Sequence, residues 1–571
     1  MSFRLRLPAM GLLAALIGMT AAAQTEPSAP AAADPPPAAA SPAAASPAVA
    51  SPAVPLPTFA ELQARGARIG EIRISAREIF DLDDPRENKL LFRWANALHI
   101  NTRAGVIANA LLFSTGQPVS AALIEETERV LRNTRYLHEV TIRPIAVHPD
   151  NTVDVEVLTR DAWTLDPGIS FSRSGGASSS GIALREYNLL GTGVGISLGR
   201  KKTVDRSSNE LEIVNDRAFG GWTSIAYSHA ANSDGSRNSL SVAQPFYALD
   251  APWSAGLSWV DDDRIDSIYR AGVIESQYRH HLRSAELFGG LSTGRVDGWV
   301  RRTSIGLARQ QDLYALEPGL PAPAQLPADE TLVAPFVRLQ LLEDDFRTLV
   351  NRNQVQRPET FAFGLDATLQ IGRASTALGS TRNAWLYSGS LSRAFDFGNE
   401  RLLVASSALR GQYADGSIRR QQVGLRLQLY LPQGPHWLFY ASATGDRLTH
   451  PGPTDELLLG GDSGLRGYPM RYQSGHRRAL FTFEERAYSN IYLWQLFRLG
   501  GAVFVDVGRA WGGDATNQIQ PGWLSNAGIG LRIFSVRAAF SNVLHLDIAV
   551  PNDPDVGVKK LQFNIKTKAS F

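Results

Sequence analysis

The stretch Leu561–Phe571, LQFNIKTKASF, alternates at every residue between two kinds of side chain. One set is apolar or small (Leu561, Phe563, Ile565, Thr567, Ala569, Phe571), and the other is polar or cationic (Gln562, Asn564, Lys566, Lys568, Ser570). Because successive side chains of a β-strand point to opposite faces, a period of two predicts a strand with one apolar face and one polar face.

Alternating segments of about ten residues recur through residues 163–571, separated by turns rich in Gly, Asn, Asp and Ser, a pattern typical of a transmembrane β-barrel. The final stretch, with Phe563, Ile565 and Phe571 on its apolar face, resembles the C-terminal signal of outer-membrane barrels. A soluble β-sandwich strand can also alternate, but it rarely ends in Phe in a chain that carries a secretory signal. We predict a mostly β fold, a transmembrane antiparallel barrel preceded by a small α+β domain.

The first residues predict export. Two arginines, the apolar run Leu12–Met19 and the small residues 21–23 predict a signal peptide over residues 1–23. Residues 24–57 are mainly Ala, Pro and Ser, which predicts a disordered linker. No apolar run of about 18 residues follows, so any membrane-embedded part is expected to be a barrel.

The composition and the local motifs exclude several classes of function. With no cysteine, the chain has no disulfide, thiolate or cysteine-zinc chemistry, and its net charge of +2 does not indicate a nucleic-acid partner. Gly461–Gly464, GDSG, matches the surroundings of a trypsin-like nucleophile, but the framing cysteines and a histidine motif are missing. Gly195–Gly199 matches a nucleophile elbow, but another strand follows it where a helix is needed. We predict a non-enzyme without metal or cofactor.

Residues 58–162 carry a pattern of strand, helix, helix, strand and strand. The first strand is expected around Ile69–Ile74, and the second helix from the N-cap Ser120 to Asn133, which suits a left-handed C-cap. Valines 153, 155 and 157 alternate with acidic residues in the last strand.

This unit resembles a POTRA domain, the periplasmic module of the BamA/TamA superfamily. The resemblance rests on Gly116–Val119 before the second helix, on Tyr136-Leu137 after it, and on Asp161–Trp163 at the end of the last strand. It departs from the family pattern by a helical insertion, Glu87–Leu98. The resemblance implies that the unit binds extended peptide by adding a strand to its sheet edge.

The glycine-rich loop 457–475 contains Leu465-Arg466-Gly467-Tyr468. After it, Glu484 shares a strand face with polar residues while Phe481 and Phe483 take the other face, and Asp506 lies opposite valines on the next strand. Alternation therefore turns both carboxylates into the lumen, where an arginine fork can pair with them.

The same loop residues resemble the lid-loop motif of the superfamily. Phe504–Gly508 resembles its partner motif on a later strand, and Asn188–Gly193 resembles a motif between the first strands. The resemblance implies that the loop folds into the lumen and that Arg466 pairs with Asp506 and Glu484. An ordinary surface-loop arginine is the alternative.

The strand number follows less directly. Alternating segments number about sixteen before the loop and five after it, but residues 58–162 and Phe571 can lie on one side of the membrane only if the total is even. The resemblance suggests sixteen strands with eleven before the loop, so that several segments between Trp253 and Tyr440 would be extracellular hairpins.

The resemblance implies a protein of the bacterial outer membrane, with its N-terminal domain in the periplasm, that inserts or translocates client polypeptides. A two-partner secretion pore is a variant, although such transporters usually carry two POTRA units. Lipid handling and a passive porin-like channel are the alternatives. The client is not indicated by the sequence.

Overall fold

The structure is a computed structural model and describes residues 56–174, 177–270, 273–354, 358–452, 454–494, 496–513, 522–535, 543–552, 554 and 558–568. The predicted signal peptide 1–23, residues 24–55 of the predicted linker and Phe571 lie outside the described residues. Within the described ranges, no helix is both long and apolar enough to span a bilayer.

Residues 58–162 form an α+β unit. Its elements are α1 (Phe59–Ala64), β1 (Arg68–Arg77), α2 (Leu90–Leu98), α3 (Ala104–Ala108), α4 (Ala121–Arg132), β2 (Leu137–Val147) and β3 (Thr152–Asp161). The sheet has the order β1-β3-β2, in which β1 is parallel and β2 antiparallel to β3. The apolar face of α4, with Ile124 and Leu131, packs in one core with Val153, Val155 and Val157 of β3.

The predicted boundaries of α4 are confirmed, with Ser120 and Asn133 as its two caps. Ser120 is the N-cap, and its hydroxyl accepts from the backbone N–H of Leu123. The predicted left-handed cap at Asn133 is wrong, because this residue is right-handed (φ −78°). The Thr134 hydroxyl donates to the carbonyl of Leu131 at 2.7 Å, which ends the helix without a left-handed residue.

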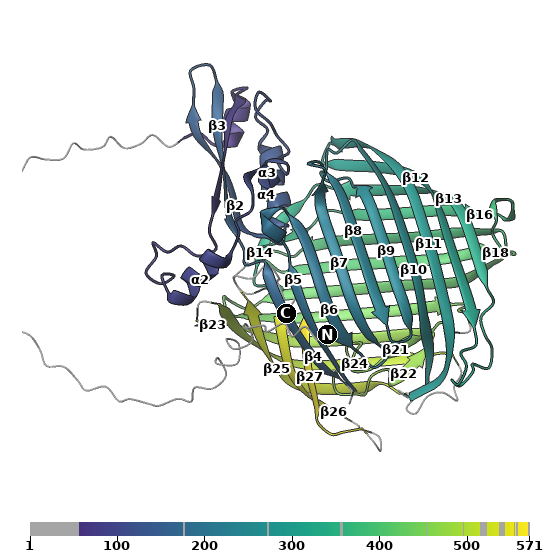
Figure 1. Cartoon of the computed structure of the whole chain (residues 1–571). Coiled ribbons are helices and arrows are strands. Elements are labelled where there is room, and N and C mark those ends of the chain that lie inside the picture. Colours follow the sequence, from purple (N-terminus) through teal and green to yellow (C-terminus); the bar gives the residue numbers. More distant parts are fainter. Residues whose placement is uncertain are drawn as a thin grey trace, which may run out of the picture. The chain divides into compact units, whose positions relative to one another are not determined.

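Beyond residue 163 the chain forms one antiparallel sheet of twenty strands that closes into a barrel (Figure 1). The strands before the loop are β4 (Leu165–Ser174), β5 (Ala177–Glu186), β6 (Val194–Lys202), β7 (Ser207–Ala218), β8 (Thr223–Asn232), β9 (Gly235–Gln244), β10 (Trp253–Arg270), β11 (Val273–Val296), β12 (Trp299–Ala315), β13 (Glu330–Glu343), β16 (Asp366–Ala374), β17 (Ala384–Asp396), β18 (Leu402–Ala414), β19 (Ser417–Pro432) and β20 (Trp437–Thr449). Those after it are β23 (Arg477–Leu493), β24 (Phe497–Trp511), β25 (Leu524–Ser535), β26 (Val543–Pro551) and β27 (Gln562–Lys568). A separate hairpin, β14 (Phe346–Val350) and β15 (Pro358–Ala362), joins β13 to β16.

The predicted total of sixteen strands is wrong. Fifteen barrel strands precede the loop, and the segments between Trp253 and Tyr440 that were expected to be hairpins pair in register on both sides as barrel strands. Among the described residues in that interval, β14 and β15 are the strands that stay outside the barrel. An even total of twenty returns β27 to the end at which β4 begins, which we call the entry end; the opposite end is the far end.

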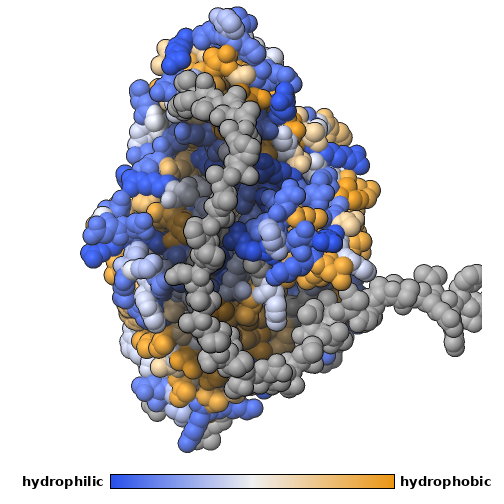
Figure 2. All heavy atoms as spheres, turned by 90° about the vertical axis from the view of Figure 1, so that its left-hand side faces the viewer, coloured by the Kyte–Doolittle hydropathy of each residue, from blue (hydrophilic) through white to orange (hydrophobic). Residues whose placement is uncertain are grey.

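The two faces of the barrel differ in polarity. A row of registered residues, Ile305, Val337 and Ile371, crosses β12, β13 and β16 on the exposed outer face. Their neighbours Arg302 and Ser304 are buried on the inner face. Seen from the left of Figure 1, hydrophilic and apolar side chains both reach this side of the molecule, with apolar patches near its top and its lower part (Figure 2). An apolar exterior around a polar interior is typical of barrels that span a bilayer.

The turn Asn188–Gly193 binds the α+β unit to the entry end. Asn188 Nδ2 donates to the hydroxyl of Thr102 at 2.8 Å, and the Arg103 N–H donates to the carbonyl of Gly191. A Cβ on Gly191, whose φ is +73°, would lie 2.4 Å from the Asn101 carbonyl oxygen. Glycine is therefore needed here for the close approach of two backbones.

Replacing Ile305 by Lys tests the outward face. Ile305 is 66% exposed, so in a soluble protein the change would be almost neutral. In a lipid-facing band we expect it to lower the free energy of unfolding by about 2–4 kcal/mol, measured by urea titration in vesicles. The control Ile305→Leu should be neutral, and a neutral Ile305→Lys would contradict the orientation.

Candidate functional site

The loop 457–475 begins and ends as a short ladder, in which β21 (Leu457–Leu459) pairs with β22 (Gln473–Gly475). Between them the backbone folds tightly on itself. A Cβ on Gly460 would lie 2.2 Å from the carbonyl oxygen of Pro469, and Gly464 has a φ of +113°. The glycines therefore permit a compact loop in place of a mobile one.

Two buried side chains flank the arginine of this loop. Leu465 and Tyr468 are fully buried and pack with Leu459, Tyr472 and Leu524. The backbone N–H of Gly467 donates to the side-chain Oδ1 of Asn526 on β25. A Cβ on Gly467 would lie 2.6 Å from the side chain of Asn526. The loop is therefore packed against the barrel wall on both sides of Arg466.

Arg466 itself pairs with carboxylates on two strands. Its Nε and Nη2 donate to the two carboxylate oxygens of Asp506, each at 2.8 Å, and its Nη1 donates to Oε1 of Glu484 at 2.9 Å. The guanidinium carbon lies 3.3 Å from the ring centroid of Phe504. A planar fork that is bound at both edges and stacked on its face is fixed in position and orientation.

Further side chains balance the charge. Thr482 and Asn526 donate to Asp506 at 2.9 Å each, and Asp547 lies 3.7 Å from Nη1 of Arg466. Arg532 in turn pairs with Asp547 at 2.5 Å. With Glu484 and Arg486, these ion pairs connect three arginines and three carboxylates, all buried.

Two opposing effects act on the pKa of Arg466. Burial lowers the pKa, but the attraction of the nearby carboxylates is larger and raises the pKa of Arg466 above its ordinary value.

The loop also binds the last strand. Asn564 Nδ2 donates to the carbonyl oxygen of Arg466 at 2.9 Å, and Lys566 Nζ donates to the carbonyl oxygen of Gly461 at 2.8 Å. Both residues lie on the inner face of β27, opposite the exposed Phe563. The loop therefore holds β27 from inside the barrel.

The hairpin β14–β15 enters the lumen from the entry end. Its Phe361 and Leu349 pack against the inner-face residues Tyr430, Tyr440 and Tyr488 of three strands. Near its tip Arg352 is 2% exposed, so this end of the hairpin is packed against its surroundings, whereas most residues of its two strands are exposed.

The hairpin and the loop meet at one carboxylate. The carbonyl oxygen of Arg352 accepts from Nη1 of Arg486 and from the hydroxyl of Tyr488, each at 3.1 Å. Arg486 Nε donates to Oε2 of Glu484 at 3.0 Å, while Arg466 binds the other oxygen of that carboxylate. The two segments thus lie in the barrel from opposite ends, and they are linked through Glu484.

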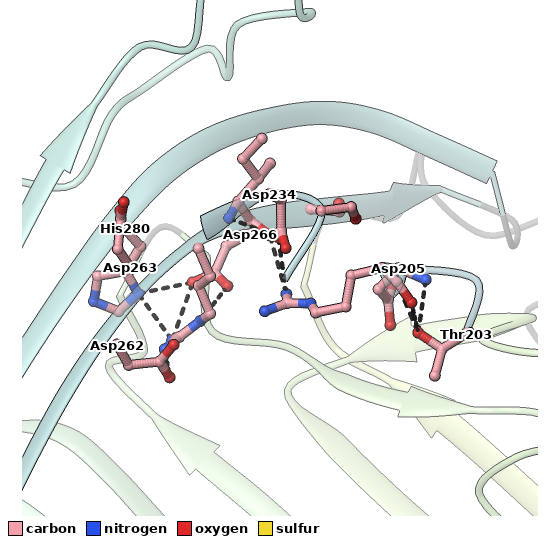
Figure 3. Close-up of polar contacts among 12 residues, drawn as sticks. Thr203, Asp205, Asp234, Asp262, Asp263, Asp266 and His280 are labelled. Carbon is pink, nitrogen blue, oxygen red and sulfur yellow. Dashed lines mark hydrogen bonds and ion pairs between the residues drawn. The ribbon is translucent and has the colours of Figure 1, made fainter. Parts of the chain in front are cut away.

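The loop has a second, more exposed arginine contact. Arg471 donates to both carboxylate oxygens of Asp205, at 2.8 and 2.7 Å, and lies over the ring of Tyr269. Figure 3 shows Asp205 beside Thr203 and, further along the wall, the group formed by Asp262, Asp266 and His280. The ion pairs of that group join side chains of the barrel wall to one another, so they stiffen the wall there. These ion pairs do not include a residue of the loop.

The structure brings together four of the predicted site residues, Leu465, Arg466, Glu484 and Asp506, with Gly467 and Tyr468 beside them. Phe563 is 51% exposed and Ile565 half-buried on the outer side of β27. Phe571 is not among the described residues. Asp547 was missed, although the same alternation along β26 turns it inward; Arg352 was missed because it binds through its backbone carbonyl, which leaves no signal in the sequence.

The serine of the rejected GDSG motif has a structural role. The hydroxyl of Ser463 accepts from the N–H of Gly460 and donates to its carbonyl, so it closes a turn of the loop. Within the described part of the chain, no three His, Cys, Asp or Glu side chains are grouped so that they could hold a metal ion.

Arg466→Ala removes the cation that binds both oxygens of Asp506 and one oxygen of Glu484. We expect it to lower the free energy of unfolding by about 3–5 kcal/mol, because it removes the ion pair of the buried Asp506, whereas Glu484 keeps its contact with Arg486. Arg466→Lys should recover part of the loss, since an ammonium restores the charge without the fork. Urea titration in detergent micelles measures both.

Arg471→Ala is the matched control in the same loop. Its pair with Asp205 is partly exposed, so the loss should be below about 1 kcal/mol. Equal losses for Arg466→Ala and Arg471→Ala would show that burial of the Arg466 pair does not matter.

Comparisons with known proteins place the chain at low similarity. No protein-family model matches it, and no curated protein matches it. Among solved structures, BamA from Haemophilus ducreyi lacking POTRA domains 1–3 is 14% identical, with a TM-score of 0.42, over 87% of this chain and 85% of that chain. CdiB from Escherichia coli is 14% identical, with a TM-score of 0.46, over 88% and 76%. The FrpB iron transporter from Neisseria meningitidis is 9% identical, with a TM-score of 0.36, over 88% and 92%.

Proposed function

We propose that this protein resides in the bacterial outer membrane and inserts polypeptides into that membrane or moves them across it. The observation that carries the proposal is the seam between β27 and β4. The entry end then faces the periplasm, where the α+β unit serves as a POTRA-like domain, and the loop 457–475 acts as a lid that enters from the cell surface.

The seam is the weakest strand pairing in the described barrel. β4 pairs with β5 along its whole length, Leu165–Ser174, and β27 pairs with β26 along its whole length, Gln562–Lys568. Among the described residues, the register between β4 and β27 contains one pair, Arg173 with Ile565. Unpaired backbone groups at a strand edge can template pairing with another chain. A client strand could therefore pair at the seam without nucleotide hydrolysis.

The edge of the α+β sheet is a less regular template. β2 is an edge strand, but its register with β3 shifts between Leu137 and Glu139 and again between Pro144 and Ala146. Proline lacks an N–H, and bulges interrupt an edge. This irregularity limits strand addition on β2 to a short segment and gives the barrel seam the main role.

A passive porin-like channel fits less well with a barrel that holds both the loop 457–475 and the hairpin β14–β15. Deleting residues 457–475 should raise single-channel conductance in planar bilayers only in part, because the hairpin 346–362 still fills the entry end. Deleting the loop and replacing that hairpin by a short Gly-Ser turn should raise conductance more than either change alone. An intact protein that already conducts as an open pore would contradict the proposal.

A disulfide across the seam tests it directly. Because the chain has no cysteine, Arg173→Cys with Ile565→Cys creates a single possible bridge at the registered pair. Oxidation should stop the delivery of client barrels while leaving the barrel folded, and reduction should restore delivery. Client levels are measured in outer membranes of cells that depend on the variant.

The matched control places the bridge between two fully paired strands, with Ile305→Cys and Val337→Cys on β12 and β13. This bridge should have no effect, because these strands need not separate. Normal delivery with the seam oxidised would refute the proposed route. A changed lipid profile with intact client proteins after depletion would favour lipid handling.

A further inference from the structure

Helix α2 has two apolar faces, one of which is covered. Phe92 is buried, its ring stacks on Phe80 with centroids 4.2 Å apart, and Asn96 exchanges two hydrogen bonds with the backbone of Phe80. On the other face Leu90, Trp94 and Leu98 are 73%, 57% and 71% exposed. A short helix that is apolar on both sides indicates a second apolar environment.

The covered face fixes α2 at the entry rim of the barrel. The cluster around Phe92 includes Trp163, which precedes β4, and Leu496, which lies in the turn between β23 and β24. After the helix, His99 pairs with Asp161 at 2.9 Å. Helix α2 is therefore held at the entry rim of the barrel by its covered face.

The turns of the same rim present apolar side chains too. Leu190, Phe219 and Trp494 are all exposed, Phe219 by 89%, and all three have positive φ (54°, 60° and 50°). Bulky residues rarely adopt this backbone conformation. Three such residues at one end of a barrel match the apolar and aromatic girdle that forms where a barrel meets the lipid headgroups.

We propose that the outer face of α2 (Leu90, Leu91, Trp94 and Leu98) lies in the phospholipid leaflet that faces the entry end and anchors the α+β unit to the membrane beside the seam. Arg93 is exposed at the edge of this face, where it can meet anionic headgroups, and Lys89 is exposed at the start of the helix, over the ring of Phe92. An interfacial helix of this kind combines an apolar face with flanking cations. The proposal rests on the membrane location given above.

Single cysteines in the cysteine-free chain test it. The full-length protein, labelled with a fluorophore at Leu98→Cys, is inserted into vesicles of phosphatidylethanolamine and phosphatidylglycerol. We expect brominated phospholipid to quench the label and aqueous iodide to have little effect. Glu125→Cys, on the exposed face of α4, is the matched control and should give the opposite result.

A third label, at Ile305→Cys, reports insertion of the barrel itself. If iodide quenches position 98 as strongly as position 125 while lipid quenches position 305, the anchor is refuted and the membrane barrel stands. If lipid fails to quench position 305, the membrane location fails as well. Protection of position 98 in native membranes but not in vesicles would indicate a protein partner and also overturn the lipid anchor.

Discussion

A buried guanidinium is costly unless its charge and its donors are met, and the interior of this barrel depends on meeting them at Arg466. Asp506 binds two of its nitrogens and Glu484 a third, on neighbouring strands that hold the carboxylates at fixed spacing. The loop can be compact because Gly460 and Gly467 allow the backbone to approach other atoms closely. The arginine thus converts a glycine-rich loop into a plug with one position.

Three otherwise separate parts of the chain meet at this charge. The hairpin β14–β15 reaches it from the entry end through Arg486, and β27 reaches it through Asn564. Among the described residues, β27 is also the strand that shares one registered pair with β4. Since the loop holds β27 from the lumen, the barrel has a weak seam whose one edge is fixed in place. In the route proposed above, a client strand joins this seam while the plug stays in place.

The sequence predicted the faces of β23, β24 and β27, because the two-residue period is local and the contrast between lipid and lumen is strong. It could equally have placed Asp547 inward. The predicted strand number was wrong for a different reason. A local pattern does not distinguish a barrel strand from a short side hairpin such as 346–362. The number sixteen was taken from the resemblance in place of the direct count of about twenty-one segments, which was close to the observed twenty. Contacts through the carbonyl of Arg352 depend on tertiary packing and leave no trace in side-chain pattern. The two apolar faces of α2 were likewise not predicted, although the sequence analysis expected a helical insertion at Glu87–Leu98.

A double-mutant cycle between Arg466 and Asp506 tests the central claim most directly. The unfolding free energies of Arg466→Ala, Asp506→Ala and the double variant are measured in the same micelles. If the pair holds the loop in the lumen, the double variant should lose less unfolding free energy than the sum of the two single losses. The difference should be about 2 kcal/mol or more, within the range found for contacting residues. Additive losses would show that the two side chains act independently and would contradict the account.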